Sequence, residues 1–171
     1  MDPLRTLYLA SVTLHVLTAA LWAGGMLFLV FVIVPLLRTP ALRDRAVALV
    51  AALGLRFRNV GWASFLVLIV TGTINAAYRA QSAGALLDPA WWSMPFGRLL
   101  AEKLGVVTLI LVLSAIHDFH VGPRASALLA AEPGTPRTLR WQHAARWMGR
   151  INLLLAVAVI AMAVALARGG W

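Results

Sequence analysis

Four long apolar stretches, each free or nearly free of charge, constrain this sequence more than any other feature. The first is the longest, because no charged residue occurs between Arg5 and Arg38. A bilayer hydrocarbon core of about 30 Å is crossed by about 20 mostly apolar residues in an α-helix. Open sheet edges are not tolerated in lipid, so stretches of this length indicate helices. The four expected spans are residues 7–37, 60–78, 99–121 and 151–167.

The composition leads to the same class of protein. Of the 171 residues, 61% are hydrophobic and only 12% are charged, which is too little polar surface for a soluble globule. The first stretch is too long for the core of a signal peptide and has no convincing cleavage site after it, so we interpret it as a retained span. We expect an all-α fold, an integral membrane four-helix bundle, in which residues 1–171 form a single membrane domain.

The distribution of positive charge predicts the orientation in the membrane. Five arginines lie from Arg38 to Arg58 and another five from Arg124 to Arg150. Because cytoplasmic loops retain an excess of Lys and Arg, both of these connections are expected in the cytoplasm. We therefore expect a bacterial inner-membrane protein with both termini outside. The net charge of +9 is attributed to these flanks and to the lipid bilayer, and no nucleic-acid partner is expected.

The segments between the spans have patterns of their own. Residues 41–57 mix arginines with apolar residues at helical spacing, which predicts a cytoplasmic extension of the second helix. Residues 81–96 contain two tryptophans and two prolines and predict an outer loop at headgroup depth, and residues 131–136 are typical of a linker. The sequence shows no convincing internal repeat. Because cysteine is absent, disulfides, thiolate metal sites and covalently attached haem are excluded.

Polar side chains within the spans are the candidate functional groups, since each costs free energy in hydrocarbon unless it faces a helix, a cofactor or water. Helical geometry predicts that the first span presents one face inward. That face comprises His15, Ala19, Trp22, Met26 and Leu29. The second span has a polar stripe of Ser64, Thr71, Asn75 and Tyr78. The third span has a stripe of Lys103, Val107, Ile110, Ser114 and His117.

The third span carries polar groups at two depths. Glu102 and Lys103 lie near its outer end, and His117 follows Lys103 by fourteen residues. At about 1.5 Å per residue they are about 21 Å apart and cannot serve one site. We therefore expect an outer cluster of His15, Asn75, Glu102 and Lys103. We also expect an inner cluster of His117, Asp118 and His120, with His143, Arg124, Arg146 and Arg150 as further candidates.

Structural roles remain open for these residues. Lys103 can anchor the helix by reaching the headgroups, and His15 can be a core histidine that is hydrogen-bonded across the bundle. Asp118 can form an ordinary ion pair with an arginine at the cytoplasmic rim. The three-residue spacing of His117 and His120 is compatible with metal chelation. The candidate metal ligands are His15, His117, His120 and His143.

Two cofactors are compatible with the outer cluster. A b-type haem needs one or two axial nitrogen ligands, aromatic and small residues beside the macrocycle, and basic groups for its propionates, which His15, Lys103 and Trp22 can supply. Copper prefers Cys or clustered Met as Cu(I) and imidazoles as Cu(II). The chain lacks Cys, and its methionines within and near the spans form no close motif. They are Met26, Met94, Met148 and Met162. Ligand chemistry therefore favours haem b, with copper as the alternative.

Several short motifs resemble the membrane domain of the copper resistance D (CopD) family. They are Leu14-His15 followed by Leu21-Trp22-Ala23-Gly24-Gly25, then Thr71-Gly72-Thr73-Ile74-Asn75-Ala76, then Gly97-Arg98-Leu99-Leu100-Ala101-Glu102-Lys103-Leu104. The same framework is similar to the HemJ-type protoporphyrinogen oxidases. Those proteins have an early His in the first helix, Lys-Leu at the start of the third and Arg-Trp at the start of the fourth.

The two resemblances imply different activities for one framework. The CopD resemblance implies copper uptake or tolerance, whereas the HemJ resemblance implies b-type haem and porphyrinogen oxidation with electrons passed to quinone. In both, His15 and Lys103 are the residues carried over as ligand or cofactor contact. We favour a haem-binding electron-transfer or oxidoreductase protein, with copper transport or resistance as the alternative and a structural subunit of a membrane complex as a third. Whether it is an enzyme stays open, as does an oligomer or a partner redox subunit.

Overall fold

The chain folds into helices in the part that the structure, a computed structural model, describes: residues 2–82 and 84–169, without the side chains of Arg43 and Asp44. The long elements are α1 (Pro3–Phe28), α3 (Ala46–Arg79), α5 (Pro95–Ile116) and α7 (Pro136–Ala167). The short ones are η1 (Leu29–Ile33), α2 (Val34–Leu36), η2 (Pro40–Arg45), η3 (Gly84–Leu87), α4 (Pro89–Ser93), η4 (His117–Val121) and α6 (Gly122–Ala131). The expected all-α fold is confirmed, with four helical stretches able to cross a membrane.

Capping residues and prolines determine where three of the helices begin. Asp2 accepts a hydrogen bond from the Leu4 N–H and precedes a proline, and Asp88 does the same for the Ala90 N–H at the start of α4. Thr135 accepts from the Thr138 N–H at the start of α7, again before a proline. A side-chain acceptor satisfies an amide that has no partner in the helix, and proline has no amide to satisfy.

Prolines also explain two irregular turns. Because Pro35 and Pro123 have no N–H, neither can continue the regular bond to the carbonyl four residues earlier. In the turn before Pro35, the Val34 N–H bonds the Leu29 carbonyl, which makes η1 a π-helical turn. In the turn before Pro123, the Gly122 N–H bonds the His117 carbonyl in the same way. The helices therefore continue through α2 and α6 without ending.

The helices are longer than the expected spans at the arginine-rich connections. α3 begins at Ala46, which confirms the helical extension predicted there. α7 begins at Pro136 instead of near residue 151, and α6 carries the third stretch on to Ala131. Residues 132–135 then form the connection expected from the linker pattern. Hydropathy underestimates these lengths, because arginines interrupt the apolar pattern but are good helix formers.

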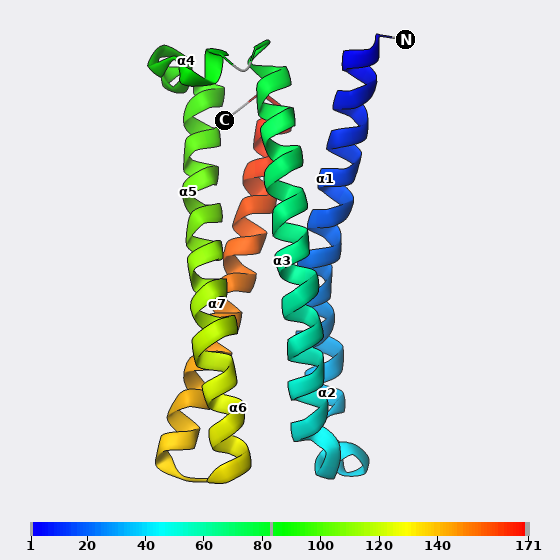
Figure 1. The fold of residues 1–171 in the computed structure, drawn as a ribbon, viewed down its shortest axis with the longest axis vertical. Coiled ribbons are helices and arrows are strands. Elements are labelled where there is room, and N and C mark those ends of the chain that lie inside the picture. The colour runs from blue at the N-terminus through cyan, green and yellow to red at the C-terminus, as the bar shows by residue number, and fades with distance from the viewer. Residues whose placement is uncertain (1, 83, 170–171) are drawn as a thin grey trace.

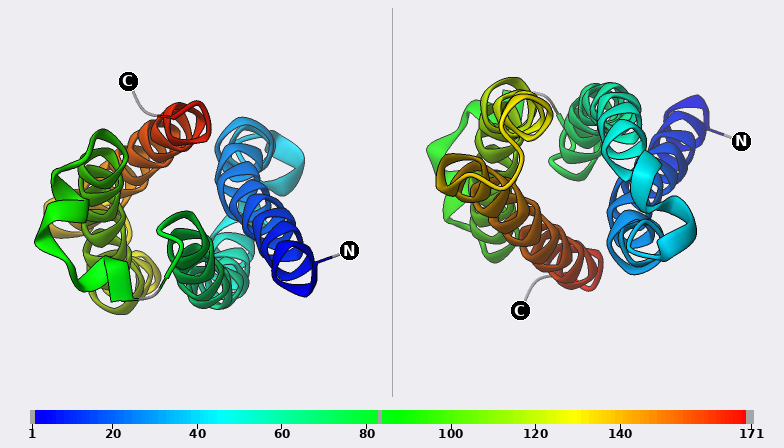
Figure 2. Two further views of the ribbon diagram at one scale, coloured as in Figure 1. Left: turned by 90° about the horizontal axis from the view of Figure 1, so that it is seen from above. Right: turned by 90° about the horizontal axis from the view of Figure 1, so that it is seen from below.

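The long helices form two pairs that run along the same axis (Figures 1 and 2). α1 packs along α3, and α5 with α6 packs along α7, whereas contact between the pairs is sparser and runs through α1 with α7 and α3 with α6. The start of α1, α4 and the end of α7 lie at one end, here called the α4 end. The connections that carry most arginines lie at the other, here called the arginine-rich end.

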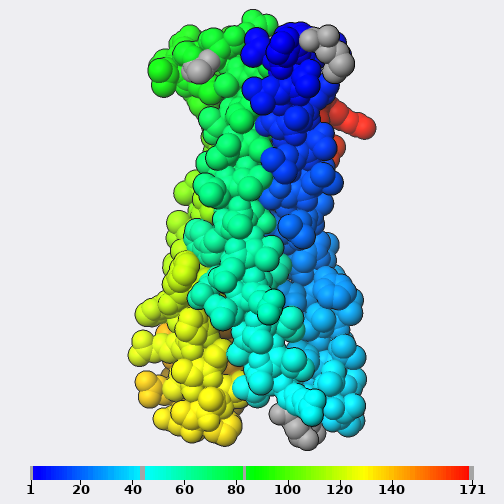
Figure 3. All heavy atoms as spheres, turned by 45° about the vertical axis from the view of Figure 1, so that its right-hand side comes forward, coloured from blue at the N-terminus to red at the C-terminus, as the bar shows by residue number. Residues whose placement is uncertain are grey.

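The packed molecule is a tall, narrow column with a small core (Figure 3). One core cluster comprises Trp22, Ala23, Phe65, Ile110 and Ala156, and a second near the α4 end comprises Leu99, Ala165 and Leu166. Large apolar side chains instead point outward, such as Phe31 at 70% exposed and Leu154 at 70%. Water would not tolerate so much apolar surface, so these side chains face lipid and the protein is an integral membrane protein.

Candidate functional site: a polar group inside the bundle

His15 is fixed inside the bundle by a hydrogen bond between two helices. Its Nδ1 lies 2.8 Å from the Thr71 Oγ1 on α3. The Thr71 hydroxyl in turn lies 2.7 Å from the carbonyl of Val67, to which it donates. Because a hydroxyl has one proton, Thr71 accepts at its oxygen from the Nδ1–H of His15. In its neutral form the ring then carries its lone pair on Nε2, the nitrogen available to a ligand or metal.

The backbone of α3 shapes the space around this imidazole. A Cβ added to Gly72 would lie 3.4 Å from the Cε1 of His15, so the ring lies directly over that glycine. The Ser11 hydroxyl donates to the Thr71 carbonyl over 3.2 Å and ties α1 to the same turn of α3. Trp22 packs in the same way over Gly61, where an added Cβ would lie 3.6 Å from the indole nitrogen. Glycines therefore let α1 and α3 approach closely along the face that carries His15.

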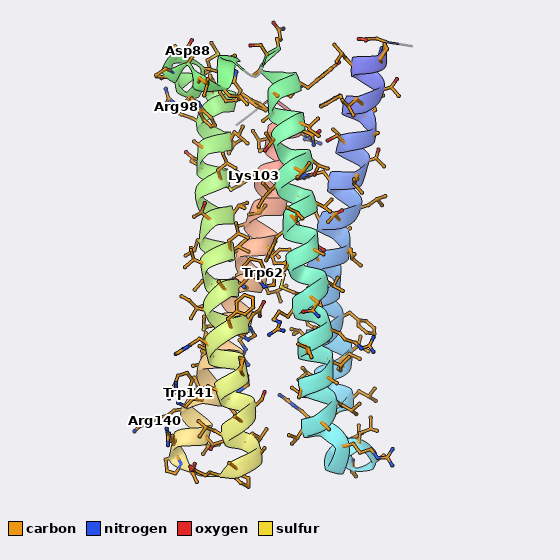
Figure 4. The ribbon with its side chains drawn as sticks, viewed as in Figure 1. Trp62, Asp88, Arg98, Lys103, Arg140 and Trp141 are labelled. Carbon is orange, nitrogen blue, oxygen red and sulfur yellow. The ribbon has the colours of Figure 1, made fainter. Side chains whose placement is uncertain are left out.

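Lys103 comes from α5, in the other pair of helices. Its side chain is half-buried, and Figure 4 places it on the side of α5 that faces α3. His15 is half-buried as well and lies on α1, in the opposite pair of helices. Its helical stripe continues inward through Ile110 and Ser114, which are buried. Within the described residues the ammonium has no carboxylate partner at ion-pair distance.

Glu102, which the sequence grouped with Lys103, points away from this group. Consecutive residues on a helix point about 100° apart, so the residue before Lys103 cannot share its inward direction. Glu102 is exposed, and it forms no ion pair with Lys103 in the part of the chain described. The group therefore comprises His15, Thr71 and Lys103, with Trp22 on the same face as His15.

Asn75 adds an unsatisfied polar atom one helical turn from Thr71. Its Oδ1 is buried and has no hydrogen-bond partner among the described atoms. A second such atom is the Oδ1 of Asn152, whose Nδ2 donates to the Ser114 hydroxyl over 2.8 Å. Buried acceptors are normally satisfied, so each of these oxygens marks a place for a water molecule or a ligand donor. Asn152 was not among the predicted site residues, although it is the only amide side chain in the last apolar stretch.

The inner cluster is organised around Asp118. Its carboxylate accepts from the Trp62 Nε1 at 3.1 Å and from the His117 Nδ1 at 2.8 Å. These two donors replace the arginine partner that sequence analysis considered, since the ion pair seen among the described residues is with His117. Arg58 instead lies over the ring of Phe119, which contacts Trp62. The carboxylate is thus joined to α3 through an indole and not through a guanidinium.

The other histidines do not converge on a metal site. His120 lies against Trp141 and His143 against Trp147, and both histidines are exposed. No group of three or more His, Cys, Asp or Glu side chains able to hold a metal occurs among the described residues. The four histidines proposed as metal ligands are therefore not gathered into one site. His15 lies on α1, His117 and His120 share η4, and His143 lies on α7.

The fold and this interior group together define a class: an integral membrane helical bundle with an imidazole and an amine between its two helix pairs. The chain belongs to the CopD family, because the family described as "Copper resistance protein D" matches residues 51–166, more than half of the chain. The resemblance seen in the motifs is thus confirmed. The matched region includes Thr71 and Lys103 but begins after His15.

The chain is also similar to a protein from Aquifex aeolicus (strain VF5) along most of its length. The two are 32% identical over 158 residues, which cover 91% of this chain and 92% of that relative, described as "Uncharacterized protein". The similarity therefore extends beyond the residues of the family match. No solved structure matches this chain.

Proposed function

We propose that this protein acts in copper uptake or copper tolerance at the membrane, with copper as its substrate. Membership of the CopD family over residues 51–166 is the observation that carries this proposal. It supports copper handling better than the haem function that ligand chemistry alone favoured. The group around His15 is the proposed place of action, since imidazole nitrogens are suitable ligands for Cu(II).

The donor set makes this a site of passage and not of storage. His15 offers one nitrogen, Nε2, with its ring held by Thr71. Cu(I) would require several soft ligands, and the chain has no cysteine. A cation bound by a single imidazole is held weakly and can leave readily.

A second candidate function is binding of b-type haem, and the two nitrogen donors on facing helices favour it. The residues fit the group: His15, oriented by Thr71, would supply one nitrogen ligand, and Lys103 would supply a second or pair with a propionate. Gly72 and Trp22 provide small and aromatic surfaces beside the imidazole. When bound, haem supplies one-electron chemistry, and the chain's own contribution is to orient the ring and exclude water.

The purified protein distinguishes these functions. The parent, His15→Ala and His143→Ala are prepared in mild detergent, and their visible spectra, their iron contents and their equilibrium binding of added Cu(II) are compared. Copper handling predicts a colourless protein whose copper binding falls at least about tenfold in His15→Ala and little in His143→Ala. A Soret band together with bound iron would support the haem function and count against copper handling. A parent protein that binds neither copper nor iron would contradict both candidates, and a structural subunit would then be the remaining function.

A growth assay tests the copper function in cells. A copper-sensitive bacterial host expresses the parent, His15→Ala or His143→Ala at equal membrane levels. Copper tolerance or uptake predicts that the parent changes the inhibitory copper concentration and that His15→Ala abolishes this change. His143→Ala is the matched control, because that histidine is exposed beside Trp147 and away from the interior. Equal growth of the host with and without the parent would count against a role in copper handling.

A further inference from the structure

The two halves of the bundle share features at one constant spacing. Pro123 follows Pro35 by 88 residues (123 − 35). The π-helical turns before these prolines, Leu29–Ile33 and His117–Val121, are separated by the same interval at both of their ends. Gly149 follows Gly61 at this interval too, although these glycines lie on α3 and α7. The same 88-residue interval therefore relates α1 to α5 and α3 to α7. The chain between equivalent positions of the two helices in each hairpin thus has the same length in both halves.

Burial follows the same spacing. Four pairs of residues that this interval relates are buried in both halves, with at most 9% of each residue exposed. They are Ser11 and Leu99, Trp22 and Ile110, Leu37 and Ala125, and Ser64 and Asn152. The pairs differ in chemistry, which is why no repeat is visible in the sequence. What is preserved is the direction in which each position points and not the identity of its side chain.

The packing has the matching symmetry. α1 packs on α3 as α5 packs on α7, and the contact of α1 with α7 corresponds to that of α6 with α3. Both hairpins begin at the α4 end and turn at the arginine-rich end (Figure 1). The end-on views show α1 opposite α5 and α3 opposite α7 (Figure 2). A twofold rotation about the long axis of the bundle relates two such hairpins, as in membrane proteins with parallel repeats.

We infer that the bundle is an internal duplication of a two-helix hairpin, residues 3–79 and 91–167, around a pseudo-twofold axis. His15 and Lys103 are related by the same 88-residue interval, so they are equivalent residues that face one ligand position on this axis from opposite helices. The next equivalent pair inward, Trp22 and Ile110, packs in one core cluster. This inference rests on the proposed function only for the nature of the ligand, a transition metal or a metal-centred cofactor.

The duplication identifies Thr71 as the residue that makes the two sides of the site different. Its counterpart is Val159, a partly buried apolar residue that packs against the core. The Thr71 hydroxyl holds the imidazole of His15 by its Nδ1–H, whereas Val159 offers the Lys103 amine no such partner. Thr71 is therefore a positioning residue: it acts on the ligand through the orientation of the His15 ring.

Cysteine pairs test the duplication without any ligand. The chain has no native cysteine, so each pair reacts with a short bifunctional thiol reagent alone. A protease site is inserted after Leu87, which is 86% exposed. After cleavage at this site, the two halves stay joined only if the cysteines are crosslinked. Equivalent pairs, His15→Cys with Lys103→Cys and Trp22→Cys with Ile110→Cys, are expected to crosslink. In the mismatched pairs, 15 with 110 and 22 with 103, one residue is displaced by seven positions, about 10 Å along the helix. These pairs are not expected to crosslink.

The result of that experiment is independent of the proposed function. Mismatched pairs that crosslink as well as equivalent pairs would overturn the duplication, whatever metal the parent binds. If replacing Trp22 prevents folding, the pair Ala19→Cys with Val107→Cys takes its place, since these half-buried residues are also equivalent. A parent without copper or iron would instead overturn the proposed function and leave the crosslinking result standing.

An exchange variant tests the shared ligand position. It carries His15→Lys, Thr71→Val, Lys103→His and Val159→Thr, which moves the imidazole and its hydroxyl partner to the other half. We expect it to retain metal or cofactor content within about threefold of the parent, against at least about tenfold loss in His15→Ala. The two-residue exchange without the hydroxyl is expected to bind less. An exchange variant that elutes as a folded protein but binds no better than His15→Ala would overturn the shared position.

Discussion

The Asp118 carboxylate accepts hydrogen bonds from Trp62 and His117. These bonds join η4, which continues α5, to α3. Trp62→Phe keeps an aromatic ring against Phe65 and removes only the N–H that Asp118 accepts. We expect a loss of about 1–2 kcal/mol in the free energy of unfolding, since hydrogen bonds to charged groups are the stronger ones. Unfolding is followed by heat or denaturant in detergent. Asp118→Ala, which removes the acceptor, closes a double-mutant cycle, and purely additive effects would show that the bond contributes nothing.

Single residues were predictable from the sequence where they were chemically out of place. His15 and Lys103 could be singled out because ionisable groups are rare in apolar stretches. The role of Thr71 could not, since threonine is common in membrane helices and its partner is 56 residues away in the chain. Glu102 points in a different direction from Lys103, because residues adjacent in sequence do not lie side by side on a helix face.

At the scale of elements, the corner between α4 and α5 depends on one glycine. A Cβ on Gly97 would overlap the Trp91 carbonyl oxygen and lie 2.8 Å from the Trp92 Cα, and backbone atoms cannot move aside as side chains do. Gly97→Ala is expected to cost about 1–3 kcal/mol or more, measured as a lower midpoint of thermal unfolding. Gly105→Ala on the same helix is the control, because nothing lies within 4 Å of an added Cβ there.

The control variant Gly105→Ala also has a predicted effect on stability. Gly105 lies inside α5, where alanine is a better helix former by up to about 1 kcal/mol, so Gly105→Ala should be neutral or stabilising. Equal destabilisation by both substitutions would show that α5 is sensitive to any alanine and not to the α4 corner. The existence of the long helices followed from hydropathy, but this corner did not, because it depends on where α4 turns back.

At the scale of the whole molecule, the arginines predict how the bundle lies in the membrane. Ten of the fifteen Lys and Arg residues lie from Arg38 to Arg58 and from Arg124 to Arg150, and both segments lie toward the arginine-rich end. The positive-inside rule places that end in the cytoplasm and both termini outside. A cytoplasmic reporter fused after Ala131 is expected to be active. A periplasmic reporter that is active at the same position would reverse the orientation.

The overall pairing of helices needed the structure. Sequence periodicity gives each helix an inward face but not its neighbour, so it could not show that His15 bonds α3 while Lys103 comes from the opposite pair. The equivalence of the two halves was also hidden, because the sequence conserves burial at matched positions more than residue type. The family match adds the copper connection, which neither periodicity nor packing could supply.

The central claim is that Lys103 faces the interior ligand position together with His15 and is not a headgroup anchor. The most direct measurement is the metal or cofactor content of purified Lys103→Met and Lys103→Arg, with Glu102→Gln as the exposed neighbouring control. Arginine keeps the charge and the reach to headgroups but cannot act as an amine ligand. The account predicts that Lys103→Met lowers the content at least about threefold, that Lys103→Arg does not restore it, and that Glu102→Gln matches the parent. A Lys103→Met protein identical to the parent in content would contradict the account.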